Sequence, residues 1–440
     1  MDDKGTNLNQ LELPSHYRRN FWCLVSDFCF FGIAMSFFST STVIPGFLTI
    51  LGASTTVIGL LTTLGRAGWL LPQLFAARYL AGKPYKKAYV LLPAALSRSL
   101  IALLAGVIWA TGAKPEKLII TLVMFTVTIF FLGDGLASLG WFDLLSKAIP
   151  SRRRGRMIST GQVFSGIFSF MAGFVVEWML SERGFPFPDN FASLFLIGFI
   201  MLGISFIAIS FLIERKGVTT EKAPTWRQYL PQLWSILKKD RTFRRYTIAR
   251  QIFGLNTMAT PFYMTFALEK LHLPAQVAGR YTSIGVVGSI LAEIVFGWLN
   301  EKQGTKHVLY YSIIVTAFIP LFALCIPLFV SNITLIAWVY GLVFLVSNAS
   351  MAIYMPGWTG YILDFASEAE RPLYMGLTNT LSGITAIFST LGGIILQWSG
   401  NNYNLLFILT LIGTLCAWPF VAILPEPRHL EGSLAAEAPL

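Results

Sequence analysis

Charged side chains are scarce in this sequence. Asp, Glu, Lys and Arg make up 12% of the 440 residues, whereas hydrophobic residues make up 55% and the mean hydropathy is +0.63. A soluble domain carries about 25% charged residues, so this chain has roughly half the usual fraction of charged side chains for contact with water. The scarcity excludes an ordinary soluble globular domain and predicts a polytopic membrane protein.

Cysteine and histidine are also rare, with four residues of each. The cysteines fall inside apolar runs without metal-binding spacing, and the histidines stand at the ends of such runs or in the tails. The chain also lacks a glycine-rich phosphate loop, a nucleophile with an adjacent base and paired catalytic carboxylates. We therefore expect no enzyme, no catalytic residue, no metal ion and no cofactor. An ATP-driven pump is excluded unless a partner chain supplies the motor.

Long apolar runs are what the chain has in quantity. Residues 1–21 are polar, and the first run is longer than the ~7–15 apolar residues of a signal peptide, so we expect it to be retained as a helix. Each run has roughly the 20 residues that cross the hydrocarbon core as a helix, which satisfies its own backbone hydrogen bonds there. An all-α polytopic protein with twelve transmembrane helices is predicted. The runs cover about 22–48, 57–77, 88–111, 118–146, 157–180, 191–213, 246–268, 281–299, 308–330, 334–363, 374–398 and 405–424.

The distribution of Lys and Arg predicts the orientation. The connections on one side of the membrane, including both ends of the chain, hold 25 of the 33 Lys and Arg residues, and those on the other side hold 5. Because cytoplasmic loops carry the excess of positive charge, both termini are expected in the cytoplasm of a multi-pass protein in a bacterial inner (plasma) membrane. The net charge of +11 then follows from topology and indicates no nucleic-acid partner.

The longest connection divides the runs into two sets of six. Its apolar side chains, such as Trp226, Tyr229 and Trp234, are interspersed with Lys and Arg. This pattern indicates an amphipathic segment on the inner membrane surface, and a regulatory binding element is the alternative. The predicted order is a cytoplasmic tail at 1–21, a six-helix bundle at 22–213, a cytoplasmic linker at 214–245, a second bundle at 246–424 and a tail at 425–440.

The two halves repeat one another weakly. With an offset of 217 residues, Gly140-Trp141 falls on Gly357-Trp358. With an offset of 220, several residues between Val57 and Gly68 fall on identical residues between Val277 and Gly288. The matches keep their order along the chain, which predicts two pseudo-symmetric bundles.

Residues 297–307 form a short charged turn between two apolar runs and read Gly-Trp-Leu-Asn-Glu-Lys-Gln-Gly-Thr-Lys-His. The turn resembles the loop signature of the major facilitator superfamily, Gly-x-Leu-x-Asp-Arg-x-Gly-Arg-Lys. A glycine in such a turn supplies a φ > 0 conformation, which we expect of Gly304. The resemblance spans nearly the whole chain and implies two six-helix bundles built from nested inverted repeats. The residues that carry it are Gly297, Glu301, Lys302, Gly304 and Lys306.

The resemblance also implies a cytoplasmic gate. In the family, the acid of this motif pairs with an Arg at the end of the fourth helix of its own half and caps a helix of the other half. Glu301 is therefore expected to meet Arg371 and to cap the helix beginning near Met157. The first half departs from the pattern, because Ala81 takes the place of the acid and leaves Arg154 unmatched. We therefore expect the acid–arginine contact of the gate, here called the latch, to be unequal in the two halves. The alternative is that Arg154 belongs to a plain basic cluster.

Ionisable side chains inside the predicted helices are functional candidates because a charge in the membrane is costly. Asp134 stands between Gly133 and Gly135, midway along the fourth predicted helix. In the family, the first, fourth, seventh and tenth helices line the central cavity. A carboxyl group in such a place can exchange a proton near neutral pH, and flanking glycines leave room for substrate or water. The alternative is a static pair with Arg98.

Other residues are weaker candidates for contact with the substrate or the coupling ion. The charged ones can instead snorkel to the interface or neutralise a nearby acid, and Arg66 suits an anionic substrate. The uncharged ones can serve as polar contacts between helices. The charged candidates are Asp27, Arg66, Arg98 and Arg250, and the uncharged ones are Gln251, Asn256, Tyr263, Asn348 and Tyr354.

These features favour a secondary active transporter that moves a small organic solute by alternating access, coupled to a proton or another ion. We expect it to work as a monomer in the lipid bilayer. An exporter of amphiphilic compounds is the alternative, although Gly161, Gly166 and Gly173 lack the proline of the family's exporter signature. A non-transporting member of the fold, acting as an assembly factor or lipid scramblase, is the alternative from a different class.

Overall fold

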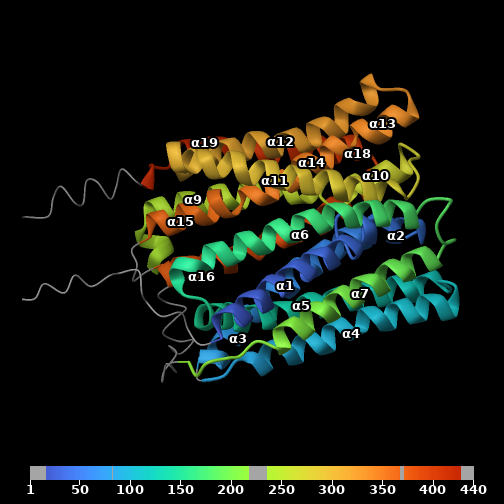
Figure 1. Cartoon of the computed structure of the whole chain (residues 1–440). Coiled ribbons are helices and arrows are strands. Elements are labelled where there is room, and N and C mark those ends of the chain that lie inside the picture. The colour runs from blue at the N-terminus through green and yellow to red at the C-terminus, as the bar shows by residue number, and fades with distance from the viewer. Residues whose placement is uncertain (1–15, 82, 218–234, 367–370, 428–440) are drawn as a thin grey trace, which may run out of the picture.

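The protein is almost entirely helical, in agreement with the predicted class. A computed structural model describes residues 16–81, 83–217, 235–366 and 371–427, and no strand occurs within these ranges. The helices run roughly side by side along one long direction (Figure 1). We call the end of the bundle at which α1 begins and α19 ends the terminal face, and the other end the opposite face.

The N-terminal half of the described chain contains the helices coloured blue to green in Figure 1. They are α1 (Tyr17–Phe37), α2 (Val43–Ile50), α3 (Thr55–Ala81), α4 (Lys87–Thr111), α5 (Glu116–Ala148), α6 (Ser151–Met179) and α7 (Asp189–Ser210).

The C-terminal half is more fragmented, with short 3₁₀ or π-helical turns inside several of the expected runs. Its elements are α9 (Arg241–Phe253), η1 (Gly254–Met258), α10 (Phe262–Glu269), α11 (Val277–Gln303), α12 (Thr305–Phe329), α13 (Ile333–Val339), α14 (Gly341–Ile353), η2 (Met355–Thr359), α15 (Gly360–Phe365), α16 (Arg371–Ser382), η3 (Ile384–Ala386), α17 (Ile387–Trp398), α18 (Tyr403–Leu415) and α19 (Trp418–Ala422).

Within the described residues, ten helical segments are long and apolar enough to cross a membrane. The two further spans expected from the sequence correspond to α3, which has 27 residues, and to the chain from α9 to α10. Most of the predicted amphipathic linker, residues 218–234, lies outside the described residues.

The expectation of one continuous first helix is wrong, because the chain leaves helical geometry between α1 and α2. Pro45 explains the break, since proline lacks the N–H for an intrahelical hydrogen bond and its ring clashes with the carbonyl four residues earlier. The seventh span is broken in the same way, where Pro261 directly precedes α10. Ser39 stabilises the first break by accepting hydrogen bonds from the N–H and hydroxyl of Thr42 (3.2 and 2.8 Å).

The helices α2 and α10 are equivalent elements of the two halves. Both contain eight residues, and they begin and end 219 positions apart. They also lie against each other, with the Thr49 hydroxyl donating to the Thr265 hydroxyl (3.2 Å), and a Cβ at Gly46 would lie 3.7 Å from the Leu268 side chain. The repeat seen weakly in the sequence is therefore expressed as a structural repeat at the opposite face.

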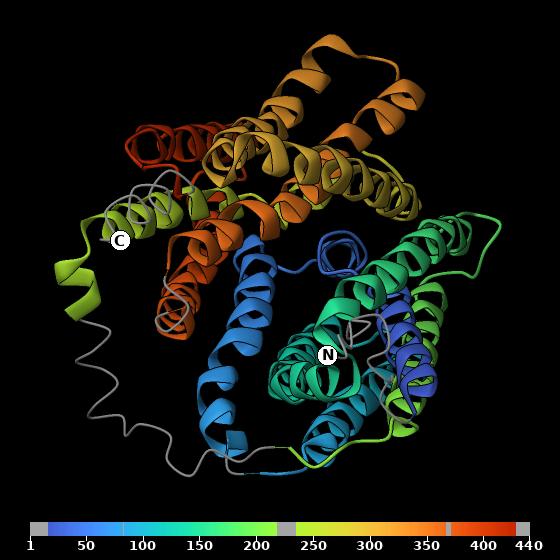
Figure 2. The ribbon, with the colours of Figure 1, turned by 60° about the vertical axis from the view of Figure 1, so that its left-hand side comes forward.

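The two halves lie side by side (Figure 2), and the described polar contacts between them lie on the half of the bundle toward the opposite face. Between α3 and α17, the Thr55 hydroxyl donates to the Gly393 carbonyl (3.1 Å). Between α6 and α11, the Ser283 hydroxyl donates to the Phe170 carbonyl (2.8 Å). Nearer the opposite face, Glu177 of α6 forms an ion pair with Arg280 of α11.

Among the described residues, the hydrophobic core is likewise shared by the two halves only toward the opposite face. One cluster joins the two halves toward the opposite face and includes Phe38, Phe195, Phe262 and Phe407. Nearer the terminal face, the buried clusters are separate, with one built from N-terminal residues and others from C-terminal residues. Because side-chain packing and hydrogen bonds between helices hold such helices together in lipid, the two halves are more closely joined toward the opposite face than toward the terminal face.

Candidate functional site

A cavity of about 440 Å³ lies within the N-terminal half, between α1, α3, α4, α5 and α7. Most of its wall is apolar and aromatic. Three predicted site residues face it together: Asp27 from α1, Arg98 from α4 and Asp134 from α5. The sequence placed these residues on three different helices, and the fold brings them into one site.

Asp27 is held by two hydrogen bonds. The indole N–H of Trp141 donates to one carboxylate oxygen (2.7 Å), and the Ser205 hydroxyl donates to the other (2.6 Å). The carboxylate is 6% exposed, so it does not snorkel to the interface. Buried carboxylates need such donors because water is excluded from them.

Arg98 lies beside Asp27 without forming an ion pair with it in the described residues. Its guanidinium donates to the Leu202 carbonyl (2.9 Å) and to the Ser205 hydroxyl (3.1 Å). Ser205 thus bridges Arg98 and Asp27. Arg98 also acts electrostatically on Asp134, but the expected alternative of a static Asp134–Arg98 ion pair is not formed.

The glycines beside Asp134 have a packing role. A Cβ at Gly133 would lie 2.5 Å from the Ser97 hydroxyl of α4, and one at Gly135 would lie 2.5 Å from the Trp69 carbonyl of α3. The glycines therefore let α4 and α3 approach α5 on either side of Asp134. The expectation that they leave room for a substrate is wrong at these two positions.

A second, smaller cavity of about 60 Å³ lies between the halves. Arg66 of α3 lines it from the N-terminal half, and the remaining lining residues come from the C-terminal half. Among the predicted site residues, Arg250, Asn256 and Tyr354 face it as well. The Asn256 amide donates to the Phe253 carbonyl (2.5 Å), which fixes its orientation at the cavity wall.

Arg250 is buried and ordered by neutral groups. Its guanidinium donates to the Ser382 hydroxyl (2.8 Å) and to the Tyr246 hydroxyl (3.0 Å), and it stacks over the Tyr354 ring at 4.6 Å from the centroid. It is 5% exposed, so the alternative of snorkelling is wrong for this residue too.

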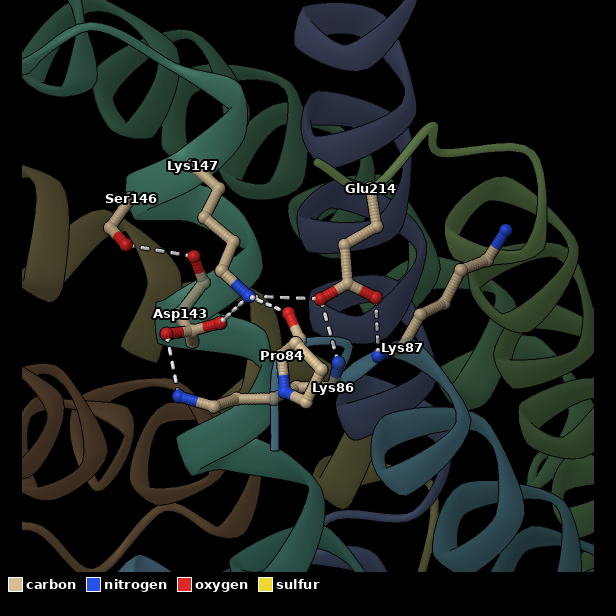
Figure 3. Close-up of polar contacts among 7 residues, drawn as sticks. All are labelled: Pro84, Lys86, Lys87, Asp143, Ser146, Lys147 and Glu214. Atoms are coloured by element: carbon tan, nitrogen blue, oxygen red, sulfur yellow. Dashed lines mark hydrogen bonds and ion pairs between the residues drawn. The ribbon is translucent and has the colours of Figure 1, made fainter. Parts of the chain in front are cut away.

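Basic and acidic side chains form a network on the terminal face of the N-terminal half (Figure 3). Asp143 pairs with Lys147 (2.6 Å), as the i, i+4 spacing predicts, and also with Lys86 (2.8 Å). Lys147 pairs in turn with Glu214 (3.0 Å). The Glu214 carboxylate accepts from the backbone N–H groups of Lys86 and Lys87 (2.6 and 2.9 Å) at the N-terminus of α4.

Glu426 occupies the equivalent place in the C-terminal half. It accepts from the backbone N–H of Lys306 (3.1 Å) in the first turn of α12. An acid that follows the last helix of each half therefore caps the third helix of the same half, where the macrodipole favours negative charge. Sequence analysis missed both caps. The only signal for them in the sequence was a Glu just beyond the sixth predicted span and another just beyond the twelfth.

The family model for the Major Facilitator Superfamily matches residues 26–390 and, in a second match, residues 247–439. The chain belongs to the major facilitator superfamily. Among curated proteins, the uncharacterized protein Rv2209 of Mycobacterium tuberculosis is 24% identical over 302 residues, as is Mb2232 of Mycobacterium bovis. These matches cover 67% of this chain but only 56% of each relative.

Solved transporters share the fold. A mutant of the nucleoside transporter NupG matches with a TM-score of 0.67 at 16% identity, covering 93% of this chain and all of that one. A POT family transporter in complex with 5-aminolevulinic acid has a TM-score of 0.68 at 11% identity, covering 92% and 96%. The D-xylose-proton symporter has 0.59 at 15%, covering 93% and 98%. At these identities, the likeness establishes the fold alone.

The superfamily loop lies where the resemblance put it, between α11 and α12. Gly304 has φ 88°, which confirms the expected positive φ, and its lack of a side chain leaves space for the Glu426 carboxylate. Lys302 lies over the Trp298 ring at 4.4 Å, and the Lys306 ammonium donates to the Ala422 carbonyl (3.1 Å). A Cβ added at Gly297 would meet nothing within 4 Å, so packing does not explain this glycine.

Of the two arginines expected in the gate, the structure describes the side-chain contacts of Arg154 but not those of Arg371. The Arg371 side chain lies outside the described part of the structure, so the pairing of Glu301 with Arg371 stays a prediction. Arg154 donates to the Ser146 and Ile149 carbonyls (2.9 and 3.1 Å). It therefore satisfies carbonyl groups at the C-terminal end of α5, as basic residues commonly do.

Three predicted site residues lie away from both cavities. Tyr263 is 3% exposed, and its ring stacks on Phe407 in the hydrophobic core. The Asn348 amide donates to the Phe344 carbonyl of its own helix (3.0 Å) and packs on Gly285 of α11, as the interhelical alternative predicts. The Gln251 amide is buried without a described partner and lines neither cavity.

Proposed function

We propose that the protein is a secondary active transporter that moves a small organic solute by alternating access, and that the cluster of Asp27, Arg98 and Asp134 couples transport to a proton. The observation that carries the proposal is the burial of these three ionisable groups around one cavity in the membrane-spanning part. Charged groups at such depth are costly and are retained for function. A carboxyl group there can exchange a proton.

Asp134 is the proton-binding residue in this proposal. Asp27 is already held by two hydrogen-bond donors, from Trp141 and Ser205. Asp134 faces the same cavity, where the Trp69 side chain hydrogen-bonds to it and the charge of Arg98 acts on it. Gain and loss of a proton at Asp134 change the net charge of the cluster while the two hydrogen bonds of Asp27 stay in place.

The arrangement of the halves supports alternating access. Polar contacts and a shared core join them toward the opposite face, whereas their cores are separate toward the terminal face. We assign the terminal face to the cytoplasm on the distribution of positive charge, so both termini are cytoplasmic and the state is inward-facing. Substrate and proton shift the balance only through different affinities for the two states.

A transport assay tests the function. Purified protein in proteoliposomes is expected to accumulate solute when a pH gradient is imposed and to lose that dependence in Asp134→Asn. The matched control is Glu182→Gln, which neutralises an exposed acid between α6 and α7. Uptake by Asp134→Asn with an unchanged dependence on the gradient would contradict the coupling role.

The aromatic wall of the larger cavity favours a second candidate function, export of amphiphilic compounds. Phe28, Phe31, Phe131 and Phe142 contribute to this wall, and aromatic surfaces bind apolar cations and dyes. Efflux of a fluorescent lipophilic cation from inverted vesicles tests this candidate. Export that Phe131→Ala leaves unchanged would exclude the cavity as its binding site.

A further inference from the structure

The cavity between the halves contains positive charge without a described carboxylate to neutralise it. Arg66 and Arg250 face it from opposite halves and repel one another electrostatically. Every other described residue of the wall is uncharged: Phe253, Gly254, Asn256, Thr257, Ser350, Met351, Tyr354, Ser382 and Thr385.

The partners of Arg250 leave its charge uncompensated. Ser382 accepts from Arg250 while donating its own proton to the Thr378 carbonyl (2.7 Å). Tyr246 does the same while donating to the Trp358 carbonyl (2.6 Å). Both groups are neutral hydroxyls with their protons engaged elsewhere. A guanidinium has five N–H donors, so several remain for a ligand.

Arg66 is less constrained than Arg250. Its side chain is half-buried, and no hydrogen bond or ion pair holds it within the described part of the structure. A half-buried cation without a partner is costly within a membrane-spanning segment. Two such cations facing each other require either solvent or an anion between them.

The geometry favours an oxyanion. Guanidinium groups bind carboxylate, phosphate and sulfate groups through paired N–H···O bonds. A cavity of about 60 Å³ has room for several water molecules, which is the space of a small anionic group. The hydroxyl protons of Thr257 and Thr385 are donated to the Gly254 and Ser382 carbonyls (2.8 and 2.7 Å). The two arginines are therefore the main donors for an anion in this cavity.

We propose that the transported solute is an anion whose carboxylate, phosphate or sulfate group binds between Arg66 and Arg250. The inference rests on the transport function proposed above. Because one arginine belongs to each half, the anion replaces repulsion between the halves with attraction. The loaded protein can then close at the terminal face, whereas the empty protein resists closure. Proton binding at the separate cluster in the N-terminal half offsets the charge that the solute carries.

Ligand-induced stabilisation of the purified full-length protein tests this site. Sodium acetate, lactate, succinate, phosphate and sulfate are compared at equal ionic strength against sodium chloride. At least one is expected to raise the unfolding temperature. Arg66→Gln and Arg250→Gln are each expected to raise its half-saturating concentration roughly 10- to 100-fold, the usual loss with a charge-assisted hydrogen bond. Arg66→Lys keeps the positive charge but not the planar guanidinium, so it should lose less affinity for the anion than Arg66→Gln.

The control variant is Arg156→Gln, which removes an exposed arginine from the terminal face with the same change in charge. If Arg250→Gln fails to fold, Arg66→Gln still tests the site, because Arg66 has no described hydrogen bond or ion pair to lose. The proposal is overturned if no oxyanion stabilises the protein beyond chloride, or if Arg66→Gln responds like the wild type.

Uptake measurements separate this inference from the transport function. Uptake of neutral xylose or uridine that Arg66→Gln leaves unchanged would overturn the anion site and leave the transporter. Specific anion binding without any gradient-driven uptake would overturn the transport function and leave the anion site.

Discussion

Arg66 and Trp69 lie one turn apart on α3 and face two different cavities. Trp69 lines the cavity of Asp134 in the N-terminal half, and Arg66 lines the cavity between the halves. The backbone of α3 at Trp69 also lies close to α5 at Gly135, next to Asp134. One continuous helix therefore connects the surroundings of the proposed proton-binding residue to the proposed anion site. A shift of α3 when Asp134 changes charge would move Arg66 with it.

Gly135→Ala is expected to disturb this connection. Its Cβ would meet the Trp69 carbonyl at 2.5 Å, and the backbone of α3 would have to move away. Overpacking of this kind costs about 1–3 kcal/mol, so we expect a lower unfolding temperature and weaker gradient-driven uptake. Gly106→Ala is the matched control, because nothing lies within 4 Å of a Cβ there and alanine is the better helix former. Equal stability of the two variants would contradict the close packing of α3 on α5.

The ion pair between Glu177 and Arg280 is expected to hold the opposite face closed. The pair is partly exposed, with 22% and 17% of the side chains accessible, so its contribution is about 1 kcal/mol. Arg280 also stacks on Trp338 at 4.0 Å. Glu177→Gln should therefore shift the populations toward the outward-open state by about fivefold, while Arg280→Gln should have a larger effect.

The measurement is the labelling rate of a single cysteine placed at Ser283, between α6 and α11, in a background without the four native cysteines. Lys117→Gln, an exposed charge near the opposite face, is the control and should leave the rate unchanged. A rate in Glu177→Gln no higher than in the control would show that other contacts close this face.

The two capping acids should differ in their contribution to stability. Glu214 accepts two backbone N–H groups and pairs with Lys147, whereas Glu426 accepts one backbone N–H. Loss of a helix cap costs about 0.5–2 kcal/mol, and breaking the Lys147 contact adds to the loss at Glu214. Thermal unfolding in detergent is expected to show a larger decrease for Glu214→Ala than for Glu426→Ala. The reverse order would contradict the view that the N-terminal network is the stronger one.

Hydropathy and charge were sufficient to predict the class, the approximate spans and the candidates Asp27, Arg98 and Asp134, because burying charge in a membrane is costly wherever it occurs. That these three, and not Arg66 or Arg250, share one cavity could not be predicted from the sequence. Which uncharged polar residues line a cavity could not be predicted in the same way. Tyr263 and Tyr354 are both tyrosines of helices expected to line the central cavity, yet one lies in the core and the other at the cavity. A helix that is apolar on every side shows no periodicity to distinguish them. The break before α2 did have a signal, Pro45.

Trp141 and Trp358 provide a matched pair for a final prediction, since they were aligned by the internal repeat. The Trp141 indole donates to the Asp27 carboxylate (2.7 Å), whereas the Trp358 indole N–H finds no acceptor among the described residues. A hydrogen bond to a charged group contributes about 1.5–3 kcal/mol. Replacing either residue by phenylalanine removes an indole N–H and a similar volume, but only Trp141→Phe deprives a carboxylate of a donor.

Trp141→Phe is therefore expected to reduce gradient-driven uptake at least tenfold in proteoliposomes, because Asp27 loses its position beside Arg98. Trp358→Phe should lower the unfolding temperature, since its buried ring stacks on Phe253 at 4.8 Å, and yet retain most of the uptake per folded molecule. Uptake must be normalised to the folded fraction, so that packing and positioning are separated. Equal losses of uptake in the two variants would mean that ring volume matters at both positions and that the bond to Asp27 has no part in transport.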